Sequence, residues 1–253
     1  MFGLDQSTQS FYQHSMVTSH IIHLSTSTAR QGLVDALIND LPGGQVFPAV
    51  DGRAMSAAER GQVAQEHLLN PAYPFGLMPS EIGCFLSHRG AWQAIAQADA
   101  PYGLVAEDDV ATGPDFPAAL KLALAHADEH CLIRFPMRNR ETADQMRDQQ
   151  EGVSLFRPQE IGLTAALYVL GRTAAQRLVE RSETFDRPVD TWLQMRWETG
   201  VDSLTLWPSH ITSAAPDNGG STIQKKRSAW GEVTRAWRRA RYRAAITKGS
   251  KRA

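Results

Sequence analysis

Short apolar runs alternate with helically spaced apolar residues along most of the chain. The runs predict buried strands, which we place at residues 20–24, 46–50, 102–106, 131–135, 153–156, 165–170 and 203–207. The helical spacing predicts the intervening helices, at residues 26–41, 56–69, 80–95, 116–130, 173–181 and 188–198. Strands that alternate with helices indicate an α/β domain built on a mostly parallel central sheet.

Two stretches do not follow this alternation. Residues 1–17 are polar and show no clear element, and residues 138–152 are dense in charge and Gln, which predicts a mobile loop. With 253 residues, the chain is long for one domain and short for two. We therefore predict one main domain at residues 18–223 and a tail at residues 224–253.

The tail differs from the body in charge and in pattern. From Gln224 onward it holds eleven Lys or Arg and one acid, whereas the rest of the chain holds 15 basic and 26 acidic residues. Its apolar residues recur at spacings of three and four: Trp230, Val233, Trp237, Ala240 and Ala244. This pattern predicts a basic amphipathic helix that meets an anionic membrane surface, where each Lys or Arg contributes roughly 1 kcal/mol. The alternative is a helix that is solvated or packed on the body. We expect no nucleic acid partner, because the acidic body opposes one.

The chain shows no pattern of membrane insertion or export. No apolar stretch approaches the about 20 residues that span a bilayer, and the first 15 residues lack the order of charges and apolar residues found in secretory signals. Cys84 and Cys131 lie among apolar residues and are expected to be reduced core thiols. We therefore predict a cytoplasmic protein, held peripherally on the inner face of the membrane by its tail.

Three consecutive acids, Glu107, Asp108 and Asp109, follow the apolar run at residues 102–106. Ligands of open α/β sheets bind at the carboxyl ends of the strands, and Mg²⁺ or Mn²⁺ is typically held there by one or two carboxylates and by substrate phosphate oxygens. The triplet therefore suits a nucleotide diphosphate bound through a metal; a solvated acidic turn is the alternative. The glycine patterns of dinucleotide-binding and P-loop enzymes are missing from the sequence, which argues against both classes.

The helix expected from Ser80 places Glu81, Cys84 and His88 on one face. This face could form a polar wall against a bound donor, or His88 could be an ordinary half-buried histidine; a zinc site would lack ligands. Asp190 could accept a proton in catalysis, or it could simply complement the dipole of the helix that it begins.

Four further side chains have both a functional and an ordinary interpretation. Arg30 and Arg134 could offset the charge of a diphosphate, although surface arginines are common. Tyr168 and Trp192 could stack on a base or a sugar, but core packing is the simpler interpretation.

Several blocks together resemble glycosyltransferase family 25, the lipooligosaccharide galactosyltransferase family. The most specific block is PSEIGCFLSH at residues 79–88, and the acidic block is LVAEDDV at residues 104–110. Weaker blocks are FPAVDG at residues 47–52, GLTAALYVL at residues 162–170, PVD at residues 188–190 and the opening strand with Leu24 and Arg30. Their order and spacing fit the family over residues 18–223. His23 and Gly171 depart from its pattern, which usually has a small polar residue and a serine at these two positions.

The resemblance implies a GT-A-like fold, a UDP-sugar donor and the use of Mn²⁺ (or Mg²⁺). It implies a set of metal ligands, Glu107 and Asp109, and a set of donor-binding residues, Arg30, Glu81, Ser87, His88, Glu107 and Asp108. Asp190 is the expected catalytic base of an inverting transfer. The expected reaction moves a hexose, galactose before glucose, onto a lipid-linked glycan acceptor such as a lipooligosaccharide. The alternative is a catalytically silent glycan- or membrane-binding module with the same fold.

Overall fold

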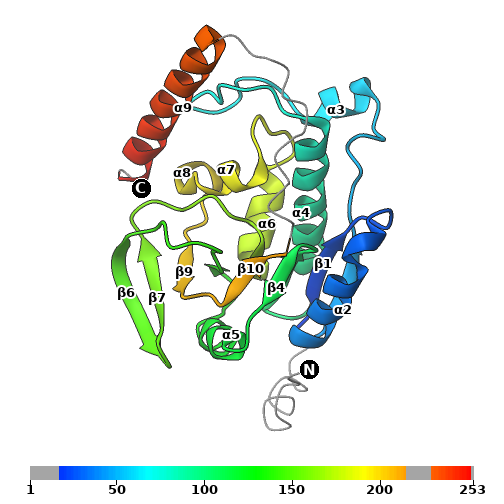
Figure 1. Ribbon diagram of the computed structural model, residues 1–253, viewed down its shortest axis with the longest axis vertical. Coiled ribbons are helices and arrows are strands. Elements are labelled where there is room, and N and C mark those ends of the chain that lie inside the picture. The colour runs from blue at the N-terminus through cyan, green and yellow to red at the C-terminus, as the bar shows by residue number, and fades with distance from the viewer. Residues whose placement is uncertain (1–16, 215–228, 252–253) are drawn as a thin grey trace.

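The computed structural model describes residues 17–214 and 229–251, and these form a layered α/β body with a long helix at its side (Figure 1). The central sheet has the strand order β2-β1-β3-β8-β5-β9-β7-β6. Its strands are β1 (Ser19–His23), β2 (Gly44–Pro48), β3 (Tyr102–Glu107), β5 (Leu132–Arg134), β6 (Ala143–Gln150), β7 (Val153–Pro158), β8 (Leu167–Gly171) and β9 (Leu204–Trp207). A second sheet pairs two short strands, β4 (Val110–Thr112) and β10 (Ile211–Ser213).

The helices cover both faces of the central sheet. In chain order they are η1 (Thr28–Arg30), α2 (Gln31–Asp40), α3 (Ala57–Val63), α4 (Pro79–Gln97), α5 (Phe116–Ala125), α6 (Arg172–Arg181), α7 (Val189–Leu193), α8 (Arg196–Thr199) and α9 (Ala229–Ser250). Side chains of α2 and α5 pack on one face of the sheet, and side chains of α4, α6 and α7 pack on the other. The sheet is thus the middle layer of three, as the α/β prediction requires.

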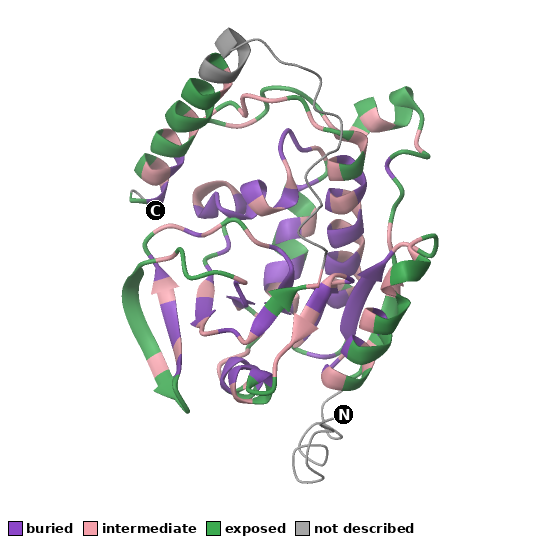
Figure 2. Ribbon diagram, viewed as in Figure 1, coloured by how far each residue is buried: buried purple, intermediate pink, exposed green. Residues whose placement is uncertain are grey.

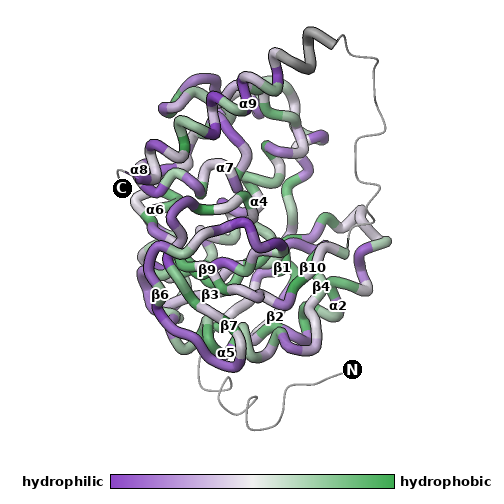
Figure 3. The backbone as a smooth tube through the Cα atoms, turned by 60° about the vertical axis from the view of Figure 1, so that its left-hand side comes forward, coloured by the Kyte–Doolittle hydropathy of each residue, from purple (hydrophilic) through white to green (hydrophobic). Residues whose placement is uncertain are grey.

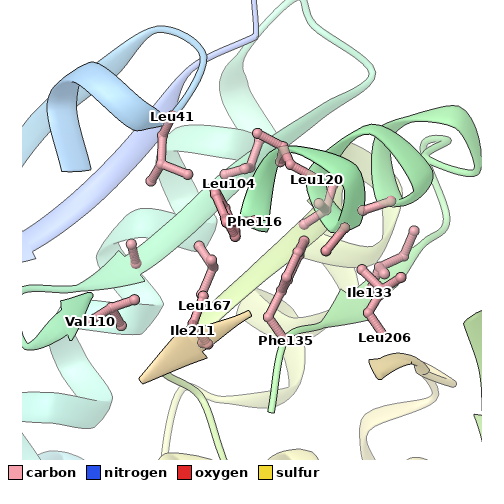
Figure 4. Packing of buried hydrophobic residues seen from close by; sticks show 14 of the residues in the cluster. Leu41, Leu104, Val110, Phe116, Leu120, Ile133, Phe135, Leu167, Leu206 and Ile211 are labelled. Atoms are coloured by element: carbon pink, nitrogen blue, oxygen red, sulfur yellow. The ribbon is translucent and has the colours of Figure 1, made fainter. Parts of the chain in front are cut away.

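Alternation along the strands builds the two cores. On β3, Leu104 and Ala106 belong to the cluster under α2 and α5, whereas Val105 belongs to the cluster under α4. Figure 4 shows the first cluster, in which Leu104, Phe116 and Leu120 come together from β3 and α5. A strand that is buried on both faces has no polar side, which explains its continuous apolar run.

The sheet is mixed, so the expected mostly parallel arrangement holds for only part of it. β1 runs parallel to β2 and β3, and β5 runs parallel to β9, but β8 lies antiparallel between β3 and β5. β7 is antiparallel to both β9 and β6. A strand between two helix layers needs apolar residues on both faces whether it runs parallel or antiparallel to its neighbours. The sequence therefore does not reveal the direction of the strand.

Two other local predictions are wrong. Residues 138–152, expected to be a mobile loop, include the strand β6, which pairs with β7 at the edge of the sheet. Seven of its eight residues are exposed, so its side chains carry no apolar signal (Figure 2). The helix expected at residues 188–198 is divided into the short helices α7 and α8.

Two glycines allow α4 to approach the segment after β2 closely. A Cβ atom at Gly83 would lie 2.5 Å from the backbone oxygen of Val50 and 2.5 Å from the backbone nitrogen of Gly52. A Cβ atom at Gly52 would lie 1.8 Å from the backbone oxygen of Pro79. The start of α4 therefore packs backbone to backbone on this segment, which sets the position of the whole helix.

The helix predicted in the tail is present as α9, but its packed side is not the predicted apolar stripe. Ile246 and Ser250 are buried, whereas Trp237, Ala240 and Ala244 are exposed. The side chains of Trp230 and Val233 lie outside the described residues. α9 therefore contacts the body through a face that the sequence pattern did not identify.

No helix within residues 17–214 and 229–251 is long and apolar enough to cross a membrane. Cys84 and Cys131 are both free thiols, in agreement with the prediction. Each of the two residues is half-buried.

Candidate active site

The acidic triplet lies where β3 leaves the sheet. β3 ends at Glu107, whose backbone N–H donates to the carbonyl of Ala166 at 2.8 Å, and Asp108 and Asp109 follow in a turn before β4. Glu107 and Asp109 line a pocket of about 390 Å³. Its other walls come from the start of α4, the start of α7 and the segment before β8. The pocket therefore lies at the carboxyl end of β3, where ligands of open α/β sheets bind.

Asp108 is directed away from this pocket and is nearly buried. One of its carboxylate oxygens lies 2.8 Å from Nδ1 of His23, and the other accepts a hydrogen bond from the guanidinium of Arg30. His23 ends β1, the parallel neighbour of β3, and Arg30 lies in the 3-10 helix that follows. Asp108 thus fastens β3 to β1 and orients Arg30, whose Nη2 lies 3.7 Å from Asp109.

Glu107 is held by a chain of buried groups that starts in α4. Its Oε1 lies 3.2 Å from Nε2 of His88, whose Nδ1 lies 2.9 Å from the hydroxyl of Tyr168. The indole N–H of Trp92 donates to the same hydroxyl at 2.7 Å. One assignment satisfies every atom: Trp92 donates to Tyr168, Tyr168 donates to His88, and His88 donates to Glu107. His88 and Tyr168 are 0 % exposed, so the chain fixes the direction of Glu107 from inside the core.

Asp190 and Glu81 also line the pocket. Oδ1 of Asp190 accepts hydrogen bonds from the backbone N–H of Thr191 at 2.7 Å and from its hydroxyl at 3.2 Å. Oδ2 receives no hydrogen bond from the described part of the chain. Glu81 accepts from the backbone N–H of Met78 at 2.7 Å and so caps the start of α4. Asp190 therefore has one oriented oxygen and one that remains available.

The carboxylates raise one another's affinity for protons. Burial raises the pKa of Asp109, and the charge of Glu107 adds to the shift, while Arg30 opposes it. Burial also raises the pKa of Asp190; its bonds to Thr191 oppose the shift, and the charge of Glu107 adds to it. A divalent cation would relieve this repulsion, and the oxygens of Glu107 and Asp109 are the hard ligands that Mn²⁺ and Mg²⁺ prefer. These two residues therefore fit the expected metal.

A second ligand set includes Glu107. Atoms of Cys84, His88 and Glu107 lie within 4.8 Å of one another. Burial, followed by the charge of Glu107, raises the pKa of the Cys84 thiol far above its ordinary range, so the sulfur stays protonated. Mn²⁺ and Mg²⁺ prefer oxygen ligands to sulfur, so this set suits either cation less well than the two carboxylates do.

Most of the expected site residues come together, and some do not. Glu81, Glu107, Asp109 and Asp190 line the pocket, His88 lies behind Glu107, and Arg30 reaches Asp109. Ser87 lies apart from the pocket lining: its hydroxyl accepts from the backbone N–H of Val50 at 2.8 Å and donates to the carbonyl of Gly83 at 2.7 Å. Its contact with a donor stays a prediction.

Three side chains considered for ligand contact are core residues instead. Tyr168 and Trp192 are 0 % and 1 % exposed, and Trp192 stacks on Trp92 with 5.9 Å between ring centroids. Arg134 is also buried, where it pairs with Glu141. Core packing is therefore confirmed for Tyr168 and Trp192, whereas Arg134 is a buried, paired arginine and not the surface residue that was the alternative.

Several groups that shape the site have no recognisable pattern in the sequence. His23 departs from the family pattern, yet it holds Asp108. Thr164, Met137 and Ser213 line the pocket from three separate loops or strand ends. Residue type alone does not single out such positions, because the fold brings them together.

The comparison with protein families decides which family this architecture represents. Residues 16–193 match the model of glycosyltransferase family 25 (LPS biosynthesis protein). The chain belongs to glycosyltransferase family 25. The matched range contains all four acids that line the pocket, and it ends before α8.

Curated relatives in animals share this family 25 region. Procollagen galactosyltransferase 1 of Danio rerio is 23 % identical over 248 residues, which cover 87 % of this chain and 40 % of the relative. Procollagen galactosyltransferase 2 of Homo sapiens is 24 % identical over 226 residues, or 77 % of this chain and 36 % of the relative. A glycosyltransferase 25 family member of Aedes aegypti is 37 % identical over 75 residues, or 28 % of this chain and 12 % of the relative. The chain therefore spans less than half the length of these relatives.

Proposed function

We propose that this protein transfers a hexose from a UDP-sugar to a glycan acceptor. The proposal rests on one observation, which is that Glu107, Asp109 and Asp190 line the same pocket at the end of β3. Two of these acids suit a cation that binds a diphosphate, and the third suits proton transfer. Membership of glycosyltransferase family 25 supports the same reaction class.

Glu107 and Asp109 would hold Mn²⁺ or Mg²⁺, and the bound metal would neutralise charge on the departing diphosphate. His88 fixes the direction of Glu107, and Arg30 adds a positive charge beside Asp109. Asp108 positions Arg30 and does not ligate the metal, because His23 and Arg30 already occupy its oxygens. The division of roles among the three acids thus follows from their hydrogen bonds.

Asp190 would accept the proton of the acceptor hydroxyl as that oxygen attacks the anomeric carbon. Its raised pKa makes it a stronger base than an exposed aspartate. Thr191 holds Oδ1, so the available oxygen Oδ2 is the atom that receives the proton. Attack from this side inverts the configuration at the anomeric carbon and gives a β-linkage from an α-linked donor.

The leading donor is UDP-galactose, followed by UDP-glucose. Two relatives are named procollagen galactosyltransferases, which supports galactose as the sugar. The description of the family names LPS biosynthesis, which supports a lipid-linked cell-surface glycan as the acceptor. The protein would then work in the cytoplasm, at the inner face of the membrane.

The basic helix α9 would hold the protein near such a membrane. Trp237, Ala240 and Ala244 are exposed on α9, together with several arginines, so they are free to meet a surface. Sedimentation with vesicles of phosphatidylglycerol should show binding that weakens as salt increases, because exposed charges are screened. Binding that does not change with salt, or no binding, would contradict this role.

A turnover assay tests the main proposal. UDP release from UDP-galactose, measured with Mn²⁺ and with EDTA, should depend on the metal in the wild type. Asp109→Ala should lose this activity, whereas Asp35→Ala, at an exposed position on α2, should retain it. Full metal-independent turnover by Asp109→Ala would refute the site, and no UDP release from any sugar donor would favour the silent binding module.

A further inference from the structure

A second and larger groove lies between α9 and residues 64–77. This segment, cyan in Figure 1, runs from α3 across to α9 and back to α4. The groove has a volume of about 940 Å³, near the upper end of the roughly 300–1,000 Å³ that is typical of ligand pockets. It is therefore large enough for several linked sugar rings.

The wall that α9 forms is positively charged. Arg238 and Arg241 line the groove and are exposed, and neither forms an ion pair within the described part of the chain. Arg60 lines the opposite side. Figure 3 shows that hydrophilic residues recur along α9. Of the two acids in the lining, Asp186 is already paired with Arg187, so only Glu66 opposes the arginines.

Aromatic rings lie among these charges. Trp237 lines the groove and is 61 % exposed, and the guanidinium of Arg241 lies 5.5 Å from the centre of its ring. Tyr73 contacts both Phe75 and Tyr242 edge to face, with centroids 5.6 and 5.5 Å apart. Exposed aromatic faces pack against the apolar faces of sugar rings, while a guanidinium stacked on a ring keeps its N–H edge available to an anion.

The groove adjoins the active-site pocket. Ile82 lines the groove, and the preceding residue, Glu81, lines the pocket. Tyr73 connects the two sites electrostatically: burial raises its pKa to about 12, and the charges of Glu81 and Asp190 add to this shift. The start of α4 therefore lies between the two sites and contributes to the lining of both.

We propose that this groove is the acceptor subsite and that it selects an oligosaccharide bearing phosphate or carboxylate groups. The arginines of α9 would bind the anionic groups, and Trp237 would pack on a sugar ring. This inference rests on the proposed transferase function, to which it adds the chemical class of the acceptor. It also gives α9 a role in acceptor binding that does not require a membrane.

Calorimetric binding without donor or metal tests the groove separately from transfer. The probes are trigalacturonate with its methyl ester, and a phosphorylated mannose oligosaccharide with its phosphatase-treated product. At least one anionic probe should bind about tenfold more tightly than its neutral counterpart, as expected when two arginines form charge-assisted bonds. The double variant R238Q/R241Q should lose this preference. The matched control R243Q/K248Q removes two charges from the same helix outside the groove and should keep it.

Three results would overturn the inference: no binding of any probe, equal binding of each anionic probe and its neutral counterpart, or equal loss in the control variant. Binding of R238Q/R241Q to vesicles of phosphatidylglycerol is measured in parallel. If vesicle binding falls in this variant while no saccharide pair is discriminated, α9 recognises a membrane and the groove is not the subsite. Selective saccharide binding by a protein that turns over no UDP-sugar would contradict the transferase proposal and leave the binding site intact.

Discussion

At the scale of single residues, Asp190 and Asp109 have carboxyl groups whose pKa is raised chiefly by burial. For each, the folded state favours the protonated form more than the unfolded state does. Ionisation therefore costs stability: the protein loses stability as pH rises from the ordinary carboxyl pKa of 3.8 through the raised value, and the loss is complete above it. The same burial that makes Asp190 a good base thus makes its ionised form destabilising.

Asp190→Asn should separate these two effects. The variant cannot accept a proton, so kcat should fall by about 10²–10⁴-fold, as when a general base is removed. Its free energy of unfolding at pH 7 should equal or exceed that of the wild type, because the variant has no charge at this buried position. Turnover and urea unfolding measure the two quantities. In the wild type, the rate should fall as pH decreases through the raised pKa of Asp190.

Asp35→Asn is the control for this change at an exposed position on α2, and it should leave both turnover and stability nearly unchanged. If Asp190→Asn kept kcat within about twofold, a factor far below that of general bases, another residue would be the base.

The sequence identifies most residues of the candidate site, but it does not show the role of each residue. A row of acids after an apolar strand identified Glu107, Asp108 and Asp109 together, yet nothing in the row shows that Asp108 faces His23. That contact arises because β1 lies beside β3, which is a long-range pairing. Ser87 shows the opposite case, in which a residue of the most specific block forms hydrogen bonds to the backbone.

At the scale of elements, the close approach of α4 to the segment after β2 determines where Glu81 and His88 lie. Gly52 and Gly83, one from each of two family 25 blocks, meet at this contact. The blocks therefore share a steric requirement as well as chemistry, because neither position leaves room for a Cβ atom.

Gly83→Ala should destabilise the protein by about 1–3 kcal/mol, the usual cost of overpacking, because the added methyl group would meet the backbone of Val50 and Gly52. The midpoint of urea unfolding measures this change. Gly61→Ala is the matched control in α3, where a Cβ atom would meet nothing within 4 Å. It should stabilise the protein by roughly 0.5–1 kcal/mol, the gain expected in a helix. Equal midpoints for the two variants would show that α4 shifts without cost.

Strands and helices with strong apolar patterns were predicted well, and elements whose stability comes from their neighbours were not. β3 and α4 have long apolar patterns, and both are present as expected. β6 is polar and exists because β7 offers it a free edge. Whether β8 runs parallel or antiparallel to its neighbours depends on how the chain connects the strands. A local sequence pattern does not predict that connection.

At the scale of the whole molecule, one buried arginine joins α9 to the body. Arg187 donates to the hydroxyl of Tyr242 at 2.8 Å, and to the carbonyls of Leu69 and Pro71 at 3.2 and 3.0 Å. The helix, the segment at residues 64–77 and the start of α7 thus meet at a single guanidinium. The shape of the acceptor groove depends on this junction.

Ile246→Asp should release α9 from the body. Ile246 is 1 % exposed, so the variant would bury an unpaired charge, which costs far more than the docked helix can tolerate. Each 1.4 kcal/mol lost should increase tryptic cleavage within α9 about tenfold, because cleavage follows the population of the released helix. Ala244→Asp introduces the same charge on the exposed side and should be cleaved like the wild type. Equal cleavage of all three proteins would contradict the docked position of α9.

The two cysteines have a practical consequence for labelling α9. Burial raises the pKa of Cys84 far above its ordinary range and that of Cys131 to about 12, so neither forms appreciable thiolate at neutral pH. A cysteine engineered on the outer side of α9 would therefore be alkylated first. A fluorescent dye could then be attached at one chosen point, without replacing either native sulfur, to report the release of α9 from the body.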